Sequence, residues 1–231
     1  VTTNPTITIP NLAPNSFFQA YVRAICSATD SSYNAGAVAF NTYGLGQYME
    51  ADKACGPGFT DISTNAAATN YNLANDGVTG MTLPFSFYYQ GTVVNEISIG
   101  NNGGIVFGSL TAPLTWNNTA INTAANGLYP FWDDMNTNGA GVYTLVTGTA
   151  PNSKVIVQWN RGRLTTLDPY SFQTVMDEAT SEIYFYHNDV VSGNATYDNG
   201  ANATVGVAGP NQDIELAFNN TTYLSQNACS H

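Results

Sequence analysis

The sequence predicts an all-β protein built from antiparallel β-sandwiches. Only 9% of the residues are charged, and Lys and Glu, which usually cover helix surfaces, are scarce, so the composition favours strands and turns. Asn-Gly pairs, a strong hairpin signal, recur at residues 102–103, 126–127, 138–139 and 199–200. No segment has the apolar spacing of an amphipathic helix. Hairpins of short strands are therefore the expected building blocks.

The balance of charge excludes two classes of partner. Five basic residues stand against sixteen acidic ones, which gives a formal net charge of -11. Because phosphate groups must be neutralised by basic side chains, we expect no nucleic acid to bind. No apolar run is long enough to cross a bilayer, so we expect no membrane insertion. An uncharged polar surface rich in Asn, Thr and Tyr is typical of a secreted or cell-surface protein, and the chain reads as a mature form or an excerpt.

The chain is expected to contain two domains. Three strand candidates, at residues 6–9, 17–25 and 37–42, precede a change in composition, and they are too few to enclose a core. The predicted boundaries are a first domain at residues 1–42, a linker at 43–54 and a second domain at 55–231.

The first domain resembles the last three strands of a fibronectin type III domain, as found in secreted proteins of Bacteroidetes-type bacteria. The residues that carry the resemblance run from Leu12 to Ala24 and from Val38 to Thr42. Phe18 replaces the tyrosine of that family's corner motif, so the hydroxyl bond of the corner is absent. The earlier strands of such a domain come either from an upstream segment or from another molecule by strand addition.

Alternating apolar residues predict the strands of the second domain. Val155, Val157 and Trp159 share one face of a strand, and Ile183 and Phe185 share a face of another. The same spacing places three residues of a late strand on one face: Ile214, Leu216 and Phe218. This period of two is typical of half-buried antiparallel strands.

The second domain resembles the nidogen-like extracellular domain. Six segments carry the resemblance in their order along the chain: residues 83–88, 97–108, 129–134, 141–143, 155–159 and 171–175. The resemblance implies a β-sandwich of the kind found in adhesive and matrix proteins, with which no catalytic residues are associated.

The segment after Trp132 is the candidate metal site. Oxygen-bearing side chains at Asp134, Asn136 and Asn138, preceded by Asp133 and followed by a glycine, are similar to the start of a calcium-binding loop. Leu145 stands where an EF-hand would have its bidentate glutamate, so an EF-hand is excluded. A calcium site completed by remote carboxylates and a tight Asx-stabilised hairpin both remain open.

No catalytic set is evident, and we expect no enzyme activity. A Ser-His-Asp triad would depend on His187, because the second of the two histidines is the terminal residue. His187 continues the alternation of its strand, which favours a structural role. Trp132 and Trp159 are expected in the core, whereas Trp116 lies in a polar run and is the candidate ligand-facing aromatic ring.

Three cysteines are present, so an oxidising compartment should pair two of them. Cys55 and Cys229 bracket the nidogen-like region. By closing the long loop between them, a disulfide would raise the free energy of unfolding by about 4 to 5 kcal/mol. The alternative pair is Cys26 with Cys55, a pairing that related bacterial fibronectin-like domains often have.

Together these features predict a non-catalytic extracellular module pair of a bacterial surface or secreted protein, acting as an adhesin, stalk or filament segment. Its partners would be a neighbouring domain or subunit, bound by strand pairing, or a surface glycan. The alternative is an accessory carbohydrate-binding module of a secreted hydrolase. Calcium is the single cofactor that the residues suggest.

Overall fold

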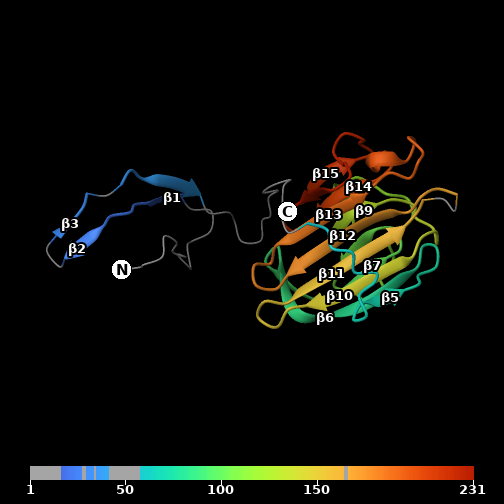
Figure 1. Ribbon diagram of the computed structural model, residues 1–231, viewed down its shortest axis with the longest axis horizontal. Helices are drawn as coiled ribbons and strands as arrows, with labels where there is room; N and C mark the ends of the chain where they lie inside the picture. Colours follow the sequence, from blue (N-terminus) through green and yellow to red (C-terminus); the bar gives the residue numbers. More distant parts are fainter. Residues whose placement is uncertain (1–16, 28–29, 34, 42–57, 164–165) are drawn as a thin grey trace. The chain divides into compact units, whose positions relative to one another are not determined.

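The chain folds into two compact units, Val1–Gln47 and Tyr48–His231 (Figure 1). The structure is a computed structural model, and it describes residues 17–27, 30–33, 35–41, 58–163 and 166–231. Strands account for 45% and helices for 3% of the described residues, which confirms the all-β prediction. The described residues include no helix with the length and apolar character that a membrane crossing requires.

The described residues of the first unit form two two-stranded ribbons. β1 (Phe17–Ala20) pairs with β4 (Val38–Asn41), and β2 (Ile25–Ser27) pairs with β3 (Asp30–Ser31), both antiparallel. The predicted strand at residues 17–25 is therefore interrupted, and the one at residues 6–9 lies outside the described residues. None of the side chains described in this unit is buried. The fibronectin-like resemblance stays a prediction.

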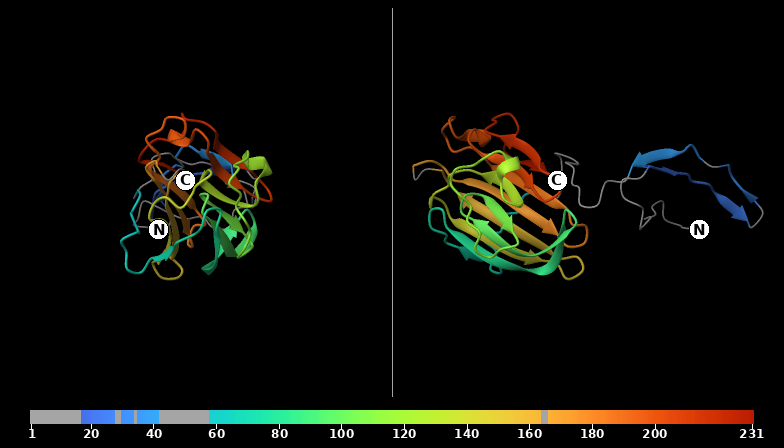
Figure 2. Two further views of the ribbon diagram at one scale, coloured as in Figure 1. Left: turned by 90° about the vertical axis from the view of Figure 1, so that its right-hand side faces the viewer. Right: turned by 180° about the vertical axis from the view of Figure 1, so that it is seen from behind.

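The second unit is a sandwich of two six-stranded antiparallel sheets, visible as two layers in Figure 2. The first sheet has the strand order β16 (Ala228–Ser230), β13 (Ile183–Asp189), β12 (Tyr170–Asp177), β11 (Lys154–Arg161), β10 (Gly141–Thr147) and β5 (Thr69–Tyr71). The second sheet has the order β15 (Ile214–Phe218), β14 (Thr204–Ala208), β9 (Gly127–Trp132), β8 (Gly104–Phe107), β7 (Thr92–Gly100) and β6 (Val78–Tyr89). Two short 3-10 turns complete it, η1 (Ile121–Thr123) and η2 (Asp198–Gly200).

The core lies between the facing surfaces of the two sheets. Val155, Val157 and Trp159 all have no exposed surface, as their alternation predicts. The indole of Trp159 stacks on the ring of Phe172 at 5.2 Å, and its Nε1 donates to the carbonyl of Gly100, 2.8 Å away in the second sheet. Because the one polar atom of the side chain is satisfied, the ring is buried without a desolvation penalty.

The predicted alternation fails at the end of β15. Ile214 and Leu216 pack partly against the core, but Phe218 is 39% exposed. The pairing of β14 with β15 shifts register between Val205 and Gly206, so Ala217 is buried instead. A β-bulge inserts one extra residue into the ladder and thereby reverses the face that later side chains occupy.

Connecting segments cover the outer faces of both sheets. On the second sheet Leu114 and Ile121 pack with Tyr129 and Trp132, so Trp132 is buried as predicted, although outside the central core. On the first sheet the segment of residues 58–68, which we call the strap, crosses the strands. The Ile62 amide donates to Gln158 Oε1 at 2.9 Å, and the strap thus satisfies a glutamine buried on an outer face.

Candidate functional site

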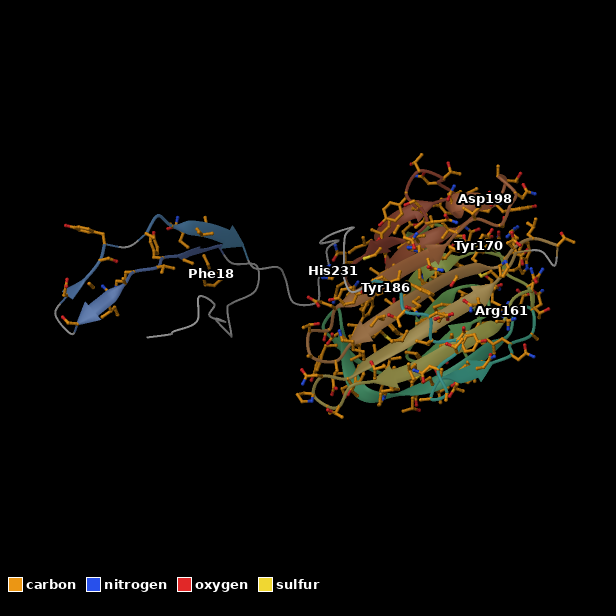
Figure 3. The ribbon with its side chains drawn as sticks, viewed as in Figure 1. Phe18, Arg161, Tyr170, Tyr186, Asp198 and His231 are labelled. Carbon is orange, nitrogen blue, oxygen red and sulfur yellow. The ribbon has the colours of Figure 1, made fainter. Side chains whose placement is uncertain are left out.

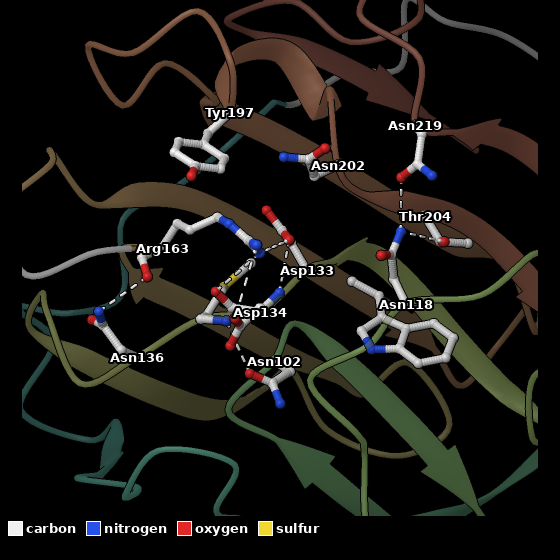
Figure 4. A network of polar contacts seen from close by, with 12 residues as sticks. Asn102, Asn118, Asp133, Asp134, Asn136, Arg163, Tyr197, Asn202, Thr204 and Asn219 are labelled. Carbon is white, nitrogen blue, oxygen red and sulfur yellow. Dashed lines mark hydrogen bonds and ion pairs between the residues drawn. The ribbon is translucent and has the colours of Figure 1, made fainter.

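The predicted calcium loop begins where β9 ends. All six residues of β9 are buried, and Asp133 follows with only 1% of its side chain exposed, whereas the side chain of Asp134 is 38% exposed. Asn102, from the turn between β7 and β8, shapes this segment: its carbonyl accepts from the Asp133 amide at 3.2 Å, and its Oδ1 accepts from the Met135 amide at 3.0 Å. Figure 4 shows these residues together.

A guanidinium lies against both carboxylates. Arg163 forms an ion pair with Asp133 Oδ1, and its Nη2 lies 3.8 Å from Asp134 Oδ2. The same guanidinium stacks over the ring of Tyr197 at 5.0 Å, which fixes its position from the other side. Arg163 therefore supplies positive charge at the place where a bound cation would supply it.

The two asparagines of the predicted loop hold neighbouring backbone. Asn136 Oδ1 accepts from the Asn138 amide at 2.7 Å, which is an Asx turn, and Asn136 Nδ2 donates to the Arg163 carbonyl at 3.0 Å. Asn138 Nδ2 donates to the Leu167 carbonyl. No group of three or more His, Cys, Asp or Glu side chains that could hold a metal occurs within the described ranges. The calcium site stays a prediction, and a cation there would have to displace Arg163.

The electrostatic environment of Asp133 is unusual. Burial raises the pKa of this carboxyl to about 6, against the lowering effects of Arg163 and of the Asp134 amide. The second oxygen, Oδ2, is buried without a hydrogen-bond partner. Asp133 can therefore gain a proton under mildly acidic conditions, at a pH where an exposed aspartate stays ionised.

His187 connects the two sheets. Its Nε2 lies 2.8 Å from the carbonyl of Pro130 in β9, so Nε2 must carry the proton, while Nδ1 is buried without a partner. Burial lowers the pKa of the imidazole to about 4. Because no carboxylate orients Nδ1, the residue lacks the arrangement of a catalytic base. This geometry favours the structural role expected from its position in the strand.

The remaining predicted residues lie apart from this cluster. Trp116 is 56% exposed, and its role as a ligand-facing ring stays a prediction. Cys229, in β16, is disulfide-bonded. Because the side chains of Cys26 and Cys55 are outside the described residues, the predicted pairing of Cys55 with Cys229 stays a prediction.

Two features carry no sequence signal. One is Arg161, fully buried and labelled in Figure 3, whose guanidinium donates to the carbonyls of Thr137 and Leu73, both at 3.1 Å. The other is a groove of about 380 Å³ beside the strap, whose lining includes Tyr184 and Tyr186.

The groove offers little free aromatic surface. The ring of Tyr184 stacks on His231 at 4.7 Å and on Tyr186 at 6.0 Å. The Lys154 ammonium at its rim is paired with Asp177 at 2.7 Å. Faces that already stack within the chain are not platforms for a sugar ring.

Comparison with known proteins identifies one family. A family model described as NIDO related matches residues 50–230, which is most of the chain and includes the region expected to be nidogen-like. The match begins before the predicted domain start at residue 55. Neither the curated proteins nor the solved structures contain a significant match.

Proposed function

The chain belongs to the NIDO-related family, and from that membership we propose that it is a non-catalytic structural module of a protein outside the cell, on a surface or secreted. The family match points to an extracellular structural domain. Two polar residues of the sandwich support this role, because they serve as cross-links: the buried His187 joins the two sheets, and the partly buried Arg163 joins two loops.

The construction of the first unit carries the finer part of the proposal, that the module assembles by strand pairing with a neighbouring chain. Two-stranded ribbons are at best marginally stable in water. Here Val22 is 74% exposed, Val38 67% and Ile25 54%. A partner would cover these exposed apolar side chains, and strand addition supplies both backbone hydrogen bonds and apolar cover.

An adhesive role follows from this design, since a module that pairs with its neighbour can serve as a segment of a stalk, filament or adhesin. The alternative, an accessory carbohydrate-binding module, is supported by the 56% exposure of Trp116. A glycan array comparing the chain with its Trp116→Ala variant separates the two functions. Binding that the substitution abolishes would favour the carbohydrate module.

The extracellular assignment is tested on the organism that makes the protein. Antibodies raised against residues 58–231 should label intact cells or detect the protein in the culture medium, and external protease should remove the label from the cells. A signal that requires cell lysis, with none in the medium, would refute the proposal. A cytoplasmic marker measured in the same samples controls for leakage.

A further inference from the structure

We propose that the neighbouring chain is a second copy of this one, and that the two copies pair through the first unit. This inference rests on the proposed strand pairing and names its partner. It is drawn from the distribution of charge between the units, the composition of the ribbon strands and the exposed apolar side chains.

The negative charge of the protein lies almost wholly outside the ribbons. Residues 58–231 contain thirteen of the sixteen acidic residues and three of the five basic ones, a formal charge of -10. Residues 17–41 contain one of each sign, Arg23 and Asp30, and are therefore neutral. Two sandwich units repel each other, whereas two ribbons do not, so the first unit is the region where like chains can approach closely.

The strands of one ribbon, β1 and β4, lack the charges and prolines that usually prevent edge pairing. β1 reads Phe-Phe-Gln-Ala and β4 reads Val-Ala-Phe-Asn, so neither contains a charged residue or a proline. Natural sheets usually protect their edges with lysine, proline or a bulge. The strands have four residues each, which limits the contribution of backbone hydrogen bonds.

Apolar side chains must supply the remaining affinity, and they are exposed. The largest exposed fractions in this unit belong to Tyr33 at 99%, Val22 at 74% and Val38 at 67%. Burial of such side chains is worth about 25 cal/mol for each Å² removed from water. Because the ribbon has no net charge, no electrostatic repulsion between two ribbons opposes that gain when the partner is identical.

The test is sedimentation velocity of the whole chain over a wide range of concentrations. We expect a concentration-dependent increase in size, and a stronger one at about 0.5 M salt than at about 0.02 M, because salt screens the repulsion between the sandwich units. A chain that stays monomeric throughout at both salt concentrations would refute self-pairing. That outcome would leave the extracellular assignment intact, since cell labelling decides it separately.

Matched variants locate the contact. Val38→Lys should weaken the association by about tenfold or more, because it places a charge on the apolar ribbon. Val93→Lys is the control: Val93 is 50% exposed, but lies in β7 of the sandwich. Both variants change the net charge equally, so a difference between them reports on the surface and not on overall repulsion. Equal loss of association in the two variants would overturn the assignment of the contact to the ribbon. Thermal melting that is unchanged from the parent chain would show that both variants are folded.

Discussion

Replacing His187 by glutamine should reveal a pH dependence of stability that the unchanged protein hides. Glutamine keeps an N–H donor for the Pro130 carbonyl but does not titrate. The unchanged protein should have nearly constant stability between about pH 4.5 and 6. In the variant, the free energy of unfolding should rise as the pH falls through that window.

The expectation follows from two buried groups whose pKa values are shifted in opposite directions. Folding lowers the pKa of His187 from 6.5 to about 4, so in this window the unfolded chain holds a proton that the native one lacks. Folding raises the pKa of Asp133 from 3.8 to about 6, so the native chain holds a proton that the unfolded one lacks. Acid therefore destabilises through His187 and stabilises through Asp133.

The magnitude follows from linkage. One proton of difference changes the free energy of unfolding by about 1.36 kcal/mol per pH unit, so about 1.5 pH units give about 2 kcal/mol. In the unchanged protein the two contributions oppose and nearly cancel. Among the described residues, three other carboxyls have pKa values lowered by folding: Asp61, Asp177 and Glu182. The stability that they contribute to the folded protein is lost mainly below this window, because that is where the unfolded chain binds protons at these carboxyls.

Urea unfolding followed by tryptophan fluorescence at fixed pH values measures the effect. Asp133→Asn is the opposite variant, because His187 is then the only one of the two groups that still titrates. Its free energy of unfolding should fall by about 2 kcal/mol as the pH is lowered through the same window. The sign of the slope is the readout, so an overall loss of stability in either variant does not disturb it. A level profile in the His187→Gln variant, or slopes of the same sign in both variants, would refute the reasoning.

Other substitutions test the site, the core and the disulfide. Arg163→Ala leaves the buried Asp133 carboxylate without its partner and should cost about 3 to 5 kcal/mol in urea unfolding. If calcium binds there, scanning calorimetry should show a larger calcium-induced rise in Tm in this variant than in the unchanged protein, because the guanidinium no longer competes. Trp159→Phe loses the hydrogen bond between the sheets and should cost about 1 to 3 kcal/mol by the same unfolding assay. Non-reducing peptide mapping should find Cys55 joined to Cys229, and Cys229→Ser should then lower the free energy of unfolding by about 4 to 5 kcal/mol; a peptide joining Cys26 to another cysteine would contradict the pairing.

The strands of the sandwich are predictable because their pattern is local. Val155, Val157 and Trp159 alternate without interruption, and the structure buries all three. Phe218 departs from its pattern because its own strand has a bulge between Ala217 and Glu215, and the pairing with β14 that sets this bulge is not visible in the alternation of one strand.

The candidate site was predictable only in part. Asx-rich turn chemistry marks Asp133 and its neighbours, but Arg163 lies thirty residues further along the chain, and only the folded topology brings the guanidinium to the carboxylate. The backbone around Asp133 is likewise held by Asn102, from a hairpin earlier in the sequence. Contacts between distant segments carry no signature in a single sequence.

The strap has a mechanical consequence for a module that bears load. In a chain without the predicted disulfide from Cys55 to Cys229, tension applied through the segment that precedes Gly58 would reach the sandwich first at residues 58–68, before any strand of the sheets. Discrete side-chain bonds hold this segment to the sheet, among them the 2.9 Å bond from Ile62 to Gln158 and the 2.5 Å bond from Gln173 to the Thr60 carbonyl. Pulled from one end, such bonds break one after another and not all at once. Without the disulfide the strap would therefore yield before the sheets and lengthen the chain under force while the core stays folded. The predicted bond from Cys55 to Cys229 would instead carry the load directly to β16 and leave the strap in place.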